Sequence, residues 1–158
     1  MKNWLVATYK ITETKRLENN LLNQDFEYYL PKITKKKINA RVNEEALFPG
    51  YIFINTSFEN YSSLKYTIGI KNIIKFGYHI SSISNDEIKA MQLLEKKTKV
   101  DPACSKIQIG QDVIIANGSF KGSLVKICSL PSKERVGVLL SLLGSERRVF
   151  ISEKDIIY

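Results

Sequence analysis

Side chains that offer sulfur or imidazole to a metal, or that form disulfides, are almost absent from this sequence of 158 residues. Cys104, Cys128 and His79 are its only cysteines and its only histidine. A structural zinc site needs four such ligands, and a disulfide framework needs several cysteine pairs. We therefore expect no metal, no cofactor and a reducing, cytoplasmic environment.

Signals for catalysis, secretion and membrane insertion are also lacking. A catalytic triad would have to use His79, which follows Gly77 in a predicted turn, and the sequence has no GxxxxGK phosphate-binding loop. No apolar run approaches the roughly 20 residues of a membrane span, and residues 1–4 do not open a signal peptide. We expect a monomeric protein that is not an enzyme and does not enter a membrane.

Positive charge, in contrast, is abundant and unevenly distributed. The sequence carries 24 Lys and Arg against 16 Asp and Glu, a net charge of +8, which favours an anionic partner. Residues 1–97 hold 15 of the basic residues, 10 of the acidic ones and most of the aromatic side chains, whereas glycine is more frequent in the last third. The densest basic run, in a predicted hairpin loop, is either solvated or attracts DNA or RNA: Lys32, Lys35, Lys36 and Lys37.

This shift in composition predicts two domains, at 1–97 and 107–158, joined by a linker at 98–106. The linker segment is polar and contains Pro102, as segments between domains often do. The chain is predicted to be an α+β protein, in which the first domain is mixed and the second is all β.

The first domain alternates between strand and helix signals. Leu17 and Leu21 stand one helical turn apart in a predicted helix over 15–24. A capping box begins at Ser84, and the apolar positions after it have helical spacing, which predicts a second helix. We expect an antiparallel sheet with helices packed on one face. Its strands are predicted at 4–9, 26–30, 51–54 and 70–76.

The second domain has the spacing of a small β-barrel, but one part of it also fits a helix. Leu139, Leu142 and Leu143 stand at i, i+3 and i+4, which favours a helical stripe. Gly137 and Gly144 disfavour a helix. The barrel is the default prediction, and a helical hairpin is the alternative. The barrel strands are predicted at 112–116, 123–128, 135–140 and 147–151.

A glycine-containing segment at the start of the second domain carries a specific motif. Asn117 and Gly118 allow a turn with positive φ, Gly122 allows a further bend, and Phe120 can fill the end of a barrel. The pattern resembles the KOW motif of the NusG family of transcription elongation factors, which implies an SH3-like barrel. The matching positions are Gly110, Val113, Gly118, Phe120 and Gly122.

The first domain resembles the same family independently. Trp4, the segment 47–54 and Phe76-Gly77 stand in the order found in the amino-terminal (NGN) domain of NusG proteins, an α/β sandwich. Phe76-Gly77 together with residues 100–103 is most similar to the RfaH-like antitermination paralogues. In those proteins the second domain can form a helical hairpin that masks the polymerase-binding face, and it can then refold as a barrel.

The resemblance implies that one face of the sheet binds the clamp helices in the largest subunit of RNA polymerase. Tyr51, Phe53 and Phe76 are expected to come from neighbouring strands and to form an aromatic patch there, the kind of surface that anchors protein partners. Core filling is the alternative for each ring. A hydroxyl-bearing motif, which lacks the family's histidine, matches residues that contact the opposite jaw of the polymerase: Tyr61, Ser62 and Ser63.

The resemblance also implies contact with the exposed non-template DNA strand of a paused complex. Lys10 and Arg16 match positions that the paralogues use for this strand. Asn20 replaces a histidine and Ile68 replaces an arginine, so we expect a different or weaker DNA preference. A solvated helix face is the alternative interpretation. The predicted DNA-binding residues are Lys10, Lys15, Arg16, Asn20 and Thr67.

These resemblances imply a transcription elongation and antitermination factor that keeps the polymerase clamp closed and suppresses pausing and termination. Its KOW domain would bind a small-subunit ribosomal protein and so couple transcription to translation. Two alternatives stay open. One is a general NusG-type factor that also engages Rho, and the other is a ribosome- or RNA-binding KOW protein that never binds polymerase.

Overall fold

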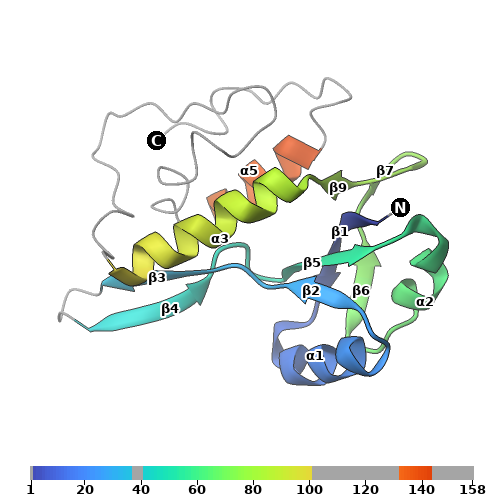
Figure 1. Ribbon diagram of the computed structural model, residues 1–158, viewed down its shortest axis with the longest axis horizontal. Coiled ribbons are helices and arrows are strands. Elements are labelled where there is room, and N and C mark those ends of the chain that lie inside the picture. Colours follow the sequence, from blue (N-terminus) through green and yellow to red (C-terminus); the bar gives the residue numbers. More distant parts are fainter. Residues whose placement is uncertain (1, 37–40, 101–131, 144–158) are drawn as a thin grey trace. The chain divides into compact units, whose positions relative to one another are not determined.

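The computed structural model describes residues 2–36, 41–100 and 132–143 (Figure 1). The chain divides into two compact units that interleave along the sequence. Met1–Leu30 and Pro49–Ser84 form unit 1, and Pro31–Phe48 and Asn85–Tyr158 form unit 2. The predicted domains, 1–97 and 107–158, follow a different division, and they stay a prediction because most of 98–131 lies outside the described residues.

Unit 1 is built on an antiparallel five-stranded sheet. Its strands are β1 (Asn3–Tyr9), β2 (Glu27–Tyr29), β5 (Tyr51–Thr56), β6 (Ile70–Ile73) and β9 (Ser82–Ile83). The order is β2-β5-β1-β6, and β9 also pairs with β1, so β6 and β9 share one edge of that strand. The middle of β1 is continuously apolar and buried, the composition of a strand that is covered on both faces. The composition therefore favours the central position for β1.

Two helices pack on one face of this sheet. They are α1 (Thr14–Asn23) and α2 (Tyr61–Lys65), preceded by the single 3₁₀ turns η1 (Ile11–Glu13) and η2 (Phe58–Asn60). Leu17 and Leu21 of α1 are fully buried in a cluster with Leu5 of β1 and Ile52 of β5. The helix predicted at 15–24 is thus confirmed, and it packs on one face of the sheet as expected.

The predicted strand at 70–76 is broken into β6 and a separate hairpin. The hairpin consists of β7 (Lys75–Phe76) and β8 (His79–Ile80), and Gly77 at its turn has a positive φ of 63°. The expectation that Tyr51, Phe53 and Phe76 come from neighbouring strands is wrong. The apolar β1 lies between β5 and β6, and Phe76 belongs to the hairpin. His79, predicted in a turn, lies on β8 and is exposed.

Unit 2 contains a hairpin of β3 (Lys32–Lys36) and β4 (Val42–Ala46), with α3 (Asn85–Val100) lying along β3 (Figure 1). The predicted second helix is confirmed. It begins directly after Ser84, and Ile88, Met91 and Leu94, its apolar residues at helical spacing, are buried. The basic run predicted as a loop lies largely on β3, and Glu44 and Glu45 lie on β4. Charged residues fit these strands because β4 is mostly exposed and Lys32 Nζ can pair with Glu44 Oε1 at 3.7 Å.

Helix α3 provides hydrogen-bond partners for the edge of β3 that β4 leaves unused. The Lys32 backbone N–H donates to Glu95 Oε1 at 3.2 Å, and the Thr34 N–H donates to Thr98 Oγ1 at 3.1 Å. The Thr98 hydroxyl in turn donates to the Glu95 carbonyl at 3.1 Å. Without these bonds, the N–H groups of Lys32 and Thr34 would have no hydrogen-bond partner, because helix α3 covers this edge of the strand.

The strand predicted at 135–140 is wrong, because these residues form part of helix α5 (Ser132–Leu143). This segment is helical, as in the helical alternative, whereas the hairpin as a whole stays a prediction. Leu139, the first residue of the predicted stripe, is fully buried, as is Val138. The other predicted barrel strands lie outside the described residues, as do the KOW positions Gly110, Val113, Gly118, Phe120 and Gly122.

Candidate functional site

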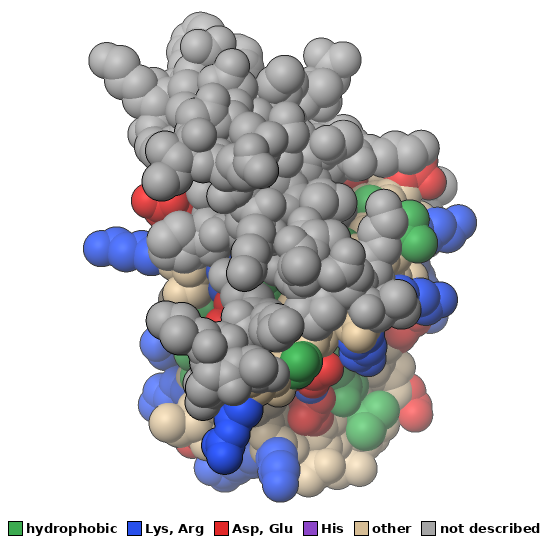
Figure 2. Space-filling model, turned by 90° about the vertical axis from the view of Figure 1, so that its left-hand side faces the viewer, with side chains coloured by type: hydrophobic (Ala, Val, Ile, Leu, Met, Phe, Trp, Pro, Cys, Tyr) green, Lys and Arg blue, Asp and Glu red, His purple; other side chains and the backbone are tan. Residues whose placement is uncertain are grey.

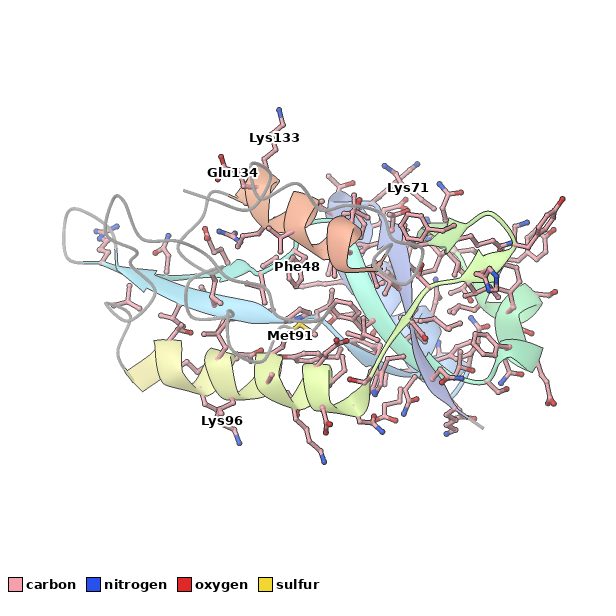
Figure 3. All side chains as sticks on the ribbon, turned by 90° about the horizontal axis from the view of Figure 1, so that it is seen from above. Phe48, Lys71, Met91, Lys96, Lys133 and Glu134 are labelled. Carbon is pink, nitrogen blue, oxygen red and sulfur yellow. The ribbon has the colours of Figure 1, made fainter. Side chains whose placement is uncertain are left out.

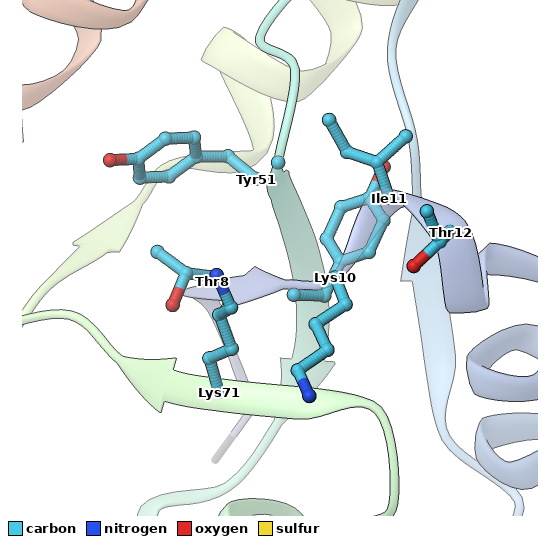
Figure 4. A pocket seen from close by; sticks show the side chains of 8 residues that line it. Thr8, Lys10, Ile11, Thr12, Tyr51 and Lys71 are labelled. Carbon is cyan, nitrogen blue, oxygen red and sulfur yellow. The ribbon is translucent and has the colours of Figure 1, made fainter.

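Basic and aromatic side chains meet at the end of β1 in an open pocket of about 450 Å³, which we call the β1-end pocket (Figure 4). Lys10 directly follows β1, Tyr51 begins β5 and Lys71 lies on β6. Three segments far apart in sequence therefore build one site. Its lining residues are Thr8, Tyr9, Lys10, Ile11, Thr12, Gly50, Tyr51 and Lys71.

The backbone around Gly50 fixes the shape of this pocket. Gly50 has a φ of 85°, a conformation that glycine adopts without a steric penalty. Its carbonyl accepts a hydrogen bond from the Tyr9 N–H at 3.0 Å, which draws the start of β5 to the end of β1. Tyr51 then stands opposite Thr8, which also pairs with Asn72 of β6 on its other side.

The pocket is positively charged and contains no carboxylate. Lys10 and Lys71 both line it, and both are exposed. A second open pocket, of about 460 Å³, has Lys2 balanced by Asp25 in its lining. Elsewhere, Lys and Arg side chains spread around the described surface without gathering into one patch in the view of Figure 2. The two pockets are thus similar in size, and they differ because the β1-end pocket has lysines without a carboxylate in its lining.

Tyrosine ionisation adds no negative charge here at neutral pH. Burial raises the pKa of the Tyr9 phenol above its usual range, and the Glu18 carboxylate raises it further. Burial also raises the pKa of Tyr28, whose hydroxyl donates a hydrogen bond to Glu18 Oε1 at 3.1 Å. Tyr9 therefore lines the pocket as a neutral ring.

The three aromatic residues predicted to bind polymerase lie in different environments. Tyr51 is half-buried in the β1-end pocket, and Phe76 is half-buried on β7. Phe53 is fully buried, opposite Val6 in the sheet. Tyr51 is grouped with Lys10 of the predicted DNA-binding set.

The predicted motif Tyr61, Ser62 and Ser63 lies on α2, and both serines are exposed. Lys75 Nζ lies 4.6 Å from the centroid of the Tyr61 ring, a cation–π contact that links the β7–β8 hairpin to α2. Ser63 lines the second pocket. The hydroxyls are thus available to a ligand, while the Tyr61 ring is held by Lys75.

Three of the five predicted DNA-binding residues present charge to solvent. All three are exposed: Lys10 directly precedes η1, and Lys15 and Arg16 lie in the first turn of α1. Arg16 Nη1 lies 3.7 Å from Glu13 Oε1, and both side chains are partly exposed. Exposed pairs of this kind contribute little to stability, so Arg16 can exchange this partner for a ligand.

The other two predicted DNA-binding residues stabilise the loop between α2 and β6. The Asn20 side-chain amide donates to the Ile68 carbonyl at 3.1 Å. Thr67 is buried, and its hydroxyl lies 3.0 Å from the Ser63 carbonyl and 3.3 Å from Gln24 Oε1. Both side chains act here as structural links between α1, α2 and β6.

A buried arginine holds helix α5 to the end of β4 in unit 2. Arg135 is 1% exposed; its Nε donates to the Leu47 carbonyl at 2.7 Å, and its Nη2 donates to the Ala46 carbonyl at 3.2 Å. The same Nη2 lies 3.1 Å from Glu45 Oε1, whose side chain is 44% exposed. A guanidinium suits this position, because its planar fork can serve several acceptors at once. We call this set the Arg135 clamp.

Sequence reasoning missed Lys71 and Arg135. Lys71 is one lysine on a short strand, and only strand pairing brings it to Lys10. Arg135 lies in a segment predicted as strand, 90 residues from Glu45. No local sequence pattern marks either residue. Covariation between positions 45 and 135 in related sequences would be the signal that could have indicated the Arg135 clamp.

Two classes of feature are absent from the described part of the chain. Its histidine and acidic residues form no group of three that could hold a metal ion. None of its helices is long and apolar enough to cross a membrane.

Comparison with known proteins gives a family match. Residues 2–92, more than half of the chain, match the family model described as "NusG: Transcription termination factor nusG". A search of curated proteins gives no match. Among solved structures, the chain is similar to one described as "Domain interaction in Thermotoga maritima NusG", with 16% identity and a TM-score of 0.43, over 72% of this chain and 69% of that chain. The family match covers nearly all of unit 1, including the β1-end pocket.

Proposed function

Because the chain belongs to the NusG family of transcription factors, we propose that it binds RNA polymerase at the clamp and suppresses pausing and termination. The observation that carries this proposal is the family match over residues 2–92, which includes Tyr51 and the sheet around it. Tyr51 is half-buried at the rim of a pocket, a suitable position for an aromatic anchor. Ser62 and Ser63 would contact the opposite jaw of the polymerase.

Within the family, we infer an RfaH-like antitermination factor rather than a general factor that engages Rho. This inference is supported by α5, which is helical where the sequence also permits a barrel strand, and by the Arg135 clamp that holds it. The helical form would be the resting form, with low affinity for polymerase. The refolded KOW barrel would bind a small-subunit ribosomal protein.

Polymerase binding is tested with Tyr51→Ala and a matched Tyr66→Ala control, since Tyr66 is 79% exposed and does not line the β1-end pocket. Tyr51→Ala is expected to weaken binding of the full chain to core polymerase at least about tenfold, the effect of losing one aromatic anchor. Tyr66→Ala should leave binding unchanged in the same pull-down. Phe53 is a poor test residue, because truncating a fully buried ring costs about 3–5 kcal/mol of stability.

The pull-down also separates the rival functions. The variant Arg135→Met removes the Arg135 clamp and should release the resting form. If neither this variant nor the native chain binds polymerase, the ribosome- or RNA-binding alternative is favoured. If both bind equally and capture Rho, the general NusG-type alternative is favoured.

The resting-form proposal predicts a gain in helix stability from Gly137→Ala. Gly137 is exposed on α5, and a Cβ built there meets no atom within 4 Å. Alanine is expected to stabilise α5 by about 1 kcal/mol and so to lower polymerase binding about fivefold. Hydrogen exchange of residues 132–143 and the pull-down measure the two effects. Lys133→Ala, at another exposed position of α5, is the control; an unchanged affinity together with slower exchange would refute the link between helix and function.

A further inference from the structure

The β7–β8 hairpin needs contacts outside itself to hold one orientation. Its strands have two residues each, and among the described strands they pair only with each other. A two-stranded hairpin of this kind is marginally stable by itself in water. Its base is fixed, because the Ile74 N–H donates to the Val6 carbonyl at 2.8 Å and the Ser81 N–H donates to the Ile74 carbonyl at 2.9 Å. Its tip carries the fully exposed Tyr78, so the position of β7 depends on side-chain contacts.

Lys75 supplies such a contact between β7 and helix α2. Its Nζ lies 4.6 Å from the centroid of the Tyr61 ring. Lys75 forms no ion pair with a residue that the structure describes. The Tyr61 ring is a fixed partner, because it is half-buried and packs against the core cluster of unit 1. The contact therefore joins β7 to the first residue of α2.

The residues next to this contact belong to two different predicted polymerase-binding surfaces. Phe76, predicted to bind the clamp, directly follows Lys75 on β7 and is half-buried. Ser62 and Ser63, predicted to contact the opposite jaw, directly follow Tyr61 on α2 and are exposed. The contact between Lys75 and Tyr61 therefore helps to set the distance and the angle between these two surfaces.

We propose that Lys75 and Tyr61 are positioning residues, whose contact holds the two surfaces at the spacing at which one molecule binds the clamp and the opposite jaw together. The proposal rests on the proposed function, and it adds Lys75, which was not in the predicted polymerase-binding set. Two contacts made by one molecule reinforce each other only if its geometry lets both form together. A spacing that is fixed before binding also lowers the entropy cost of binding.

The test is a titration of core polymerase with the fluorescently labelled full chain. Lys75→Met keeps most of the aliphatic side chain but removes its charge. It is expected to weaken binding about twofold to fivefold, the contribution of one exposed cation–π contact. Lys75→Arg should restore the native affinity, because a guanidinium also binds the face of an aromatic ring.

Lys65→Met is the matched control. Lys65 is an exposed lysine of α2, and its Nζ lies 5.7 Å from the centroid of the Tyr66 ring. Lys65 and Tyr66 are neighbours in sequence, so this cation–π contact does not join two segments. Lys65→Met should leave the affinity for polymerase unchanged, and a loss equal to that of Lys75→Met would reduce the role of Lys75 to net charge.

A second background separates positioning from general damage to the hairpin. In a chain that carries Ser62→Ala and Ser63→Ala, the contact with the opposite jaw is already lost, and the spacing of the two surfaces no longer affects binding. Lys75→Met should then cause no further loss of affinity. A loss by the same factor in both backgrounds would mean that the two sites act independently, and it would overturn the proposal.

Hydrogen exchange of the free chain gives a readout that needs no polymerase. Lys75→Met should accelerate exchange of the amides of residues 75–80 about twofold to fivefold. Faster exchange with an unchanged affinity for polymerase would refute the role of the contact in binding. If the native chain binds polymerase and Lys75→Met behaves like Lys65→Met, this inference alone fails. If the native chain does not bind polymerase, the proposed function fails, and this inference fails with it.

Discussion

Replacing Arg135 by methionine is expected to release helix α5. The substitution keeps most of the side-chain volume but leaves the carbonyls of Leu47 and Ala46 without their donor, and Leu47 is buried. Loss of the hydrogen bonds to two carbonyls at the buried Arg135 position, together with loss of the half-exposed ion pair to Glu45, predicts a loss of about 3 kcal/mol. Hydrogen exchange of the α5 amides should then accelerate about a hundredfold, and the helical signal in circular dichroism should fall.

Two control variants test whether the effect of Arg135→Met is specific to the buried arginine. Lys133→Met changes a solvent-exposed lysine on the same helix, which points away from the ribbon in Figure 3, and should leave exchange unaltered. Glu45→Gln should have a small effect, because the Glu45 side chain is 44% exposed and its charge is already screened by water. Equal exchange rates for Arg135→Met and Lys133→Met would show that the clamp does not hold the helix.

Replacing Gly69 by alanine is expected to destabilise unit 1 by about 3 kcal/mol. Gly69 has a φ of 106°, which is strained for any residue with a side chain, and a Cβ there would lie 2.9 Å from Leu17 Cβ. Leu17 is fully buried on α1 and cannot move aside without disturbing the core cluster. Thermal unfolding should show a fall in Tm of about 10 °C.

Gly50→Ala separates the two causes of this loss. Gly50 also has a positive φ, of 85°, but the nearest atom to an added Cβ is the Tyr9 carbonyl oxygen at 4.0 Å. Backbone strain alone should cost about 1–2 kcal/mol. Equal losses for the two variants would show that contact with Leu17 contributes nothing.

Local sequence patterns were sufficient to predict several helices and strands, but not which strands lie next to each other in the sheet. Helices α1 and α3 could be predicted because helical periodicity is local. The spacing of Leu17 and Leu21 predicts α1, and the capping box at Ser84 predicts the start of α3. Strand adjacency depends on long-range pairing, so the place of β1 between β5 and β6 could not be read from β5 and β6 alone. Residues 135–140 were predicted as a strand by default and as a helix in the alternative, and the structure shows the helix, in which Arg135 contacts the end of β4.

The candidate site was predicted in part for the same reason. Lys10 and Tyr51 were predicted for two different surfaces, and the structure places both in one pocket. Asn20 and Thr67 are polar in sequence, but tertiary hydrogen bonds already use their side chains. Sequence supplies the chemistry of a side chain, whereas its availability depends on which partner the fold brings to it.

The hydrogen bonds from α3 to β3 have a consequence for self-association. An exposed strand edge presents free N–H groups that can recruit a strand from another molecule and start aggregation. In β3, the N–H groups of Lys32 and Thr34 are occupied by Glu95 and Thr98. Helix α3 therefore blocks the addition of another strand at this edge of β3. If α3 unwound, these N–H groups would become free to pair with a strand of a second molecule, and the chain would tend to aggregate.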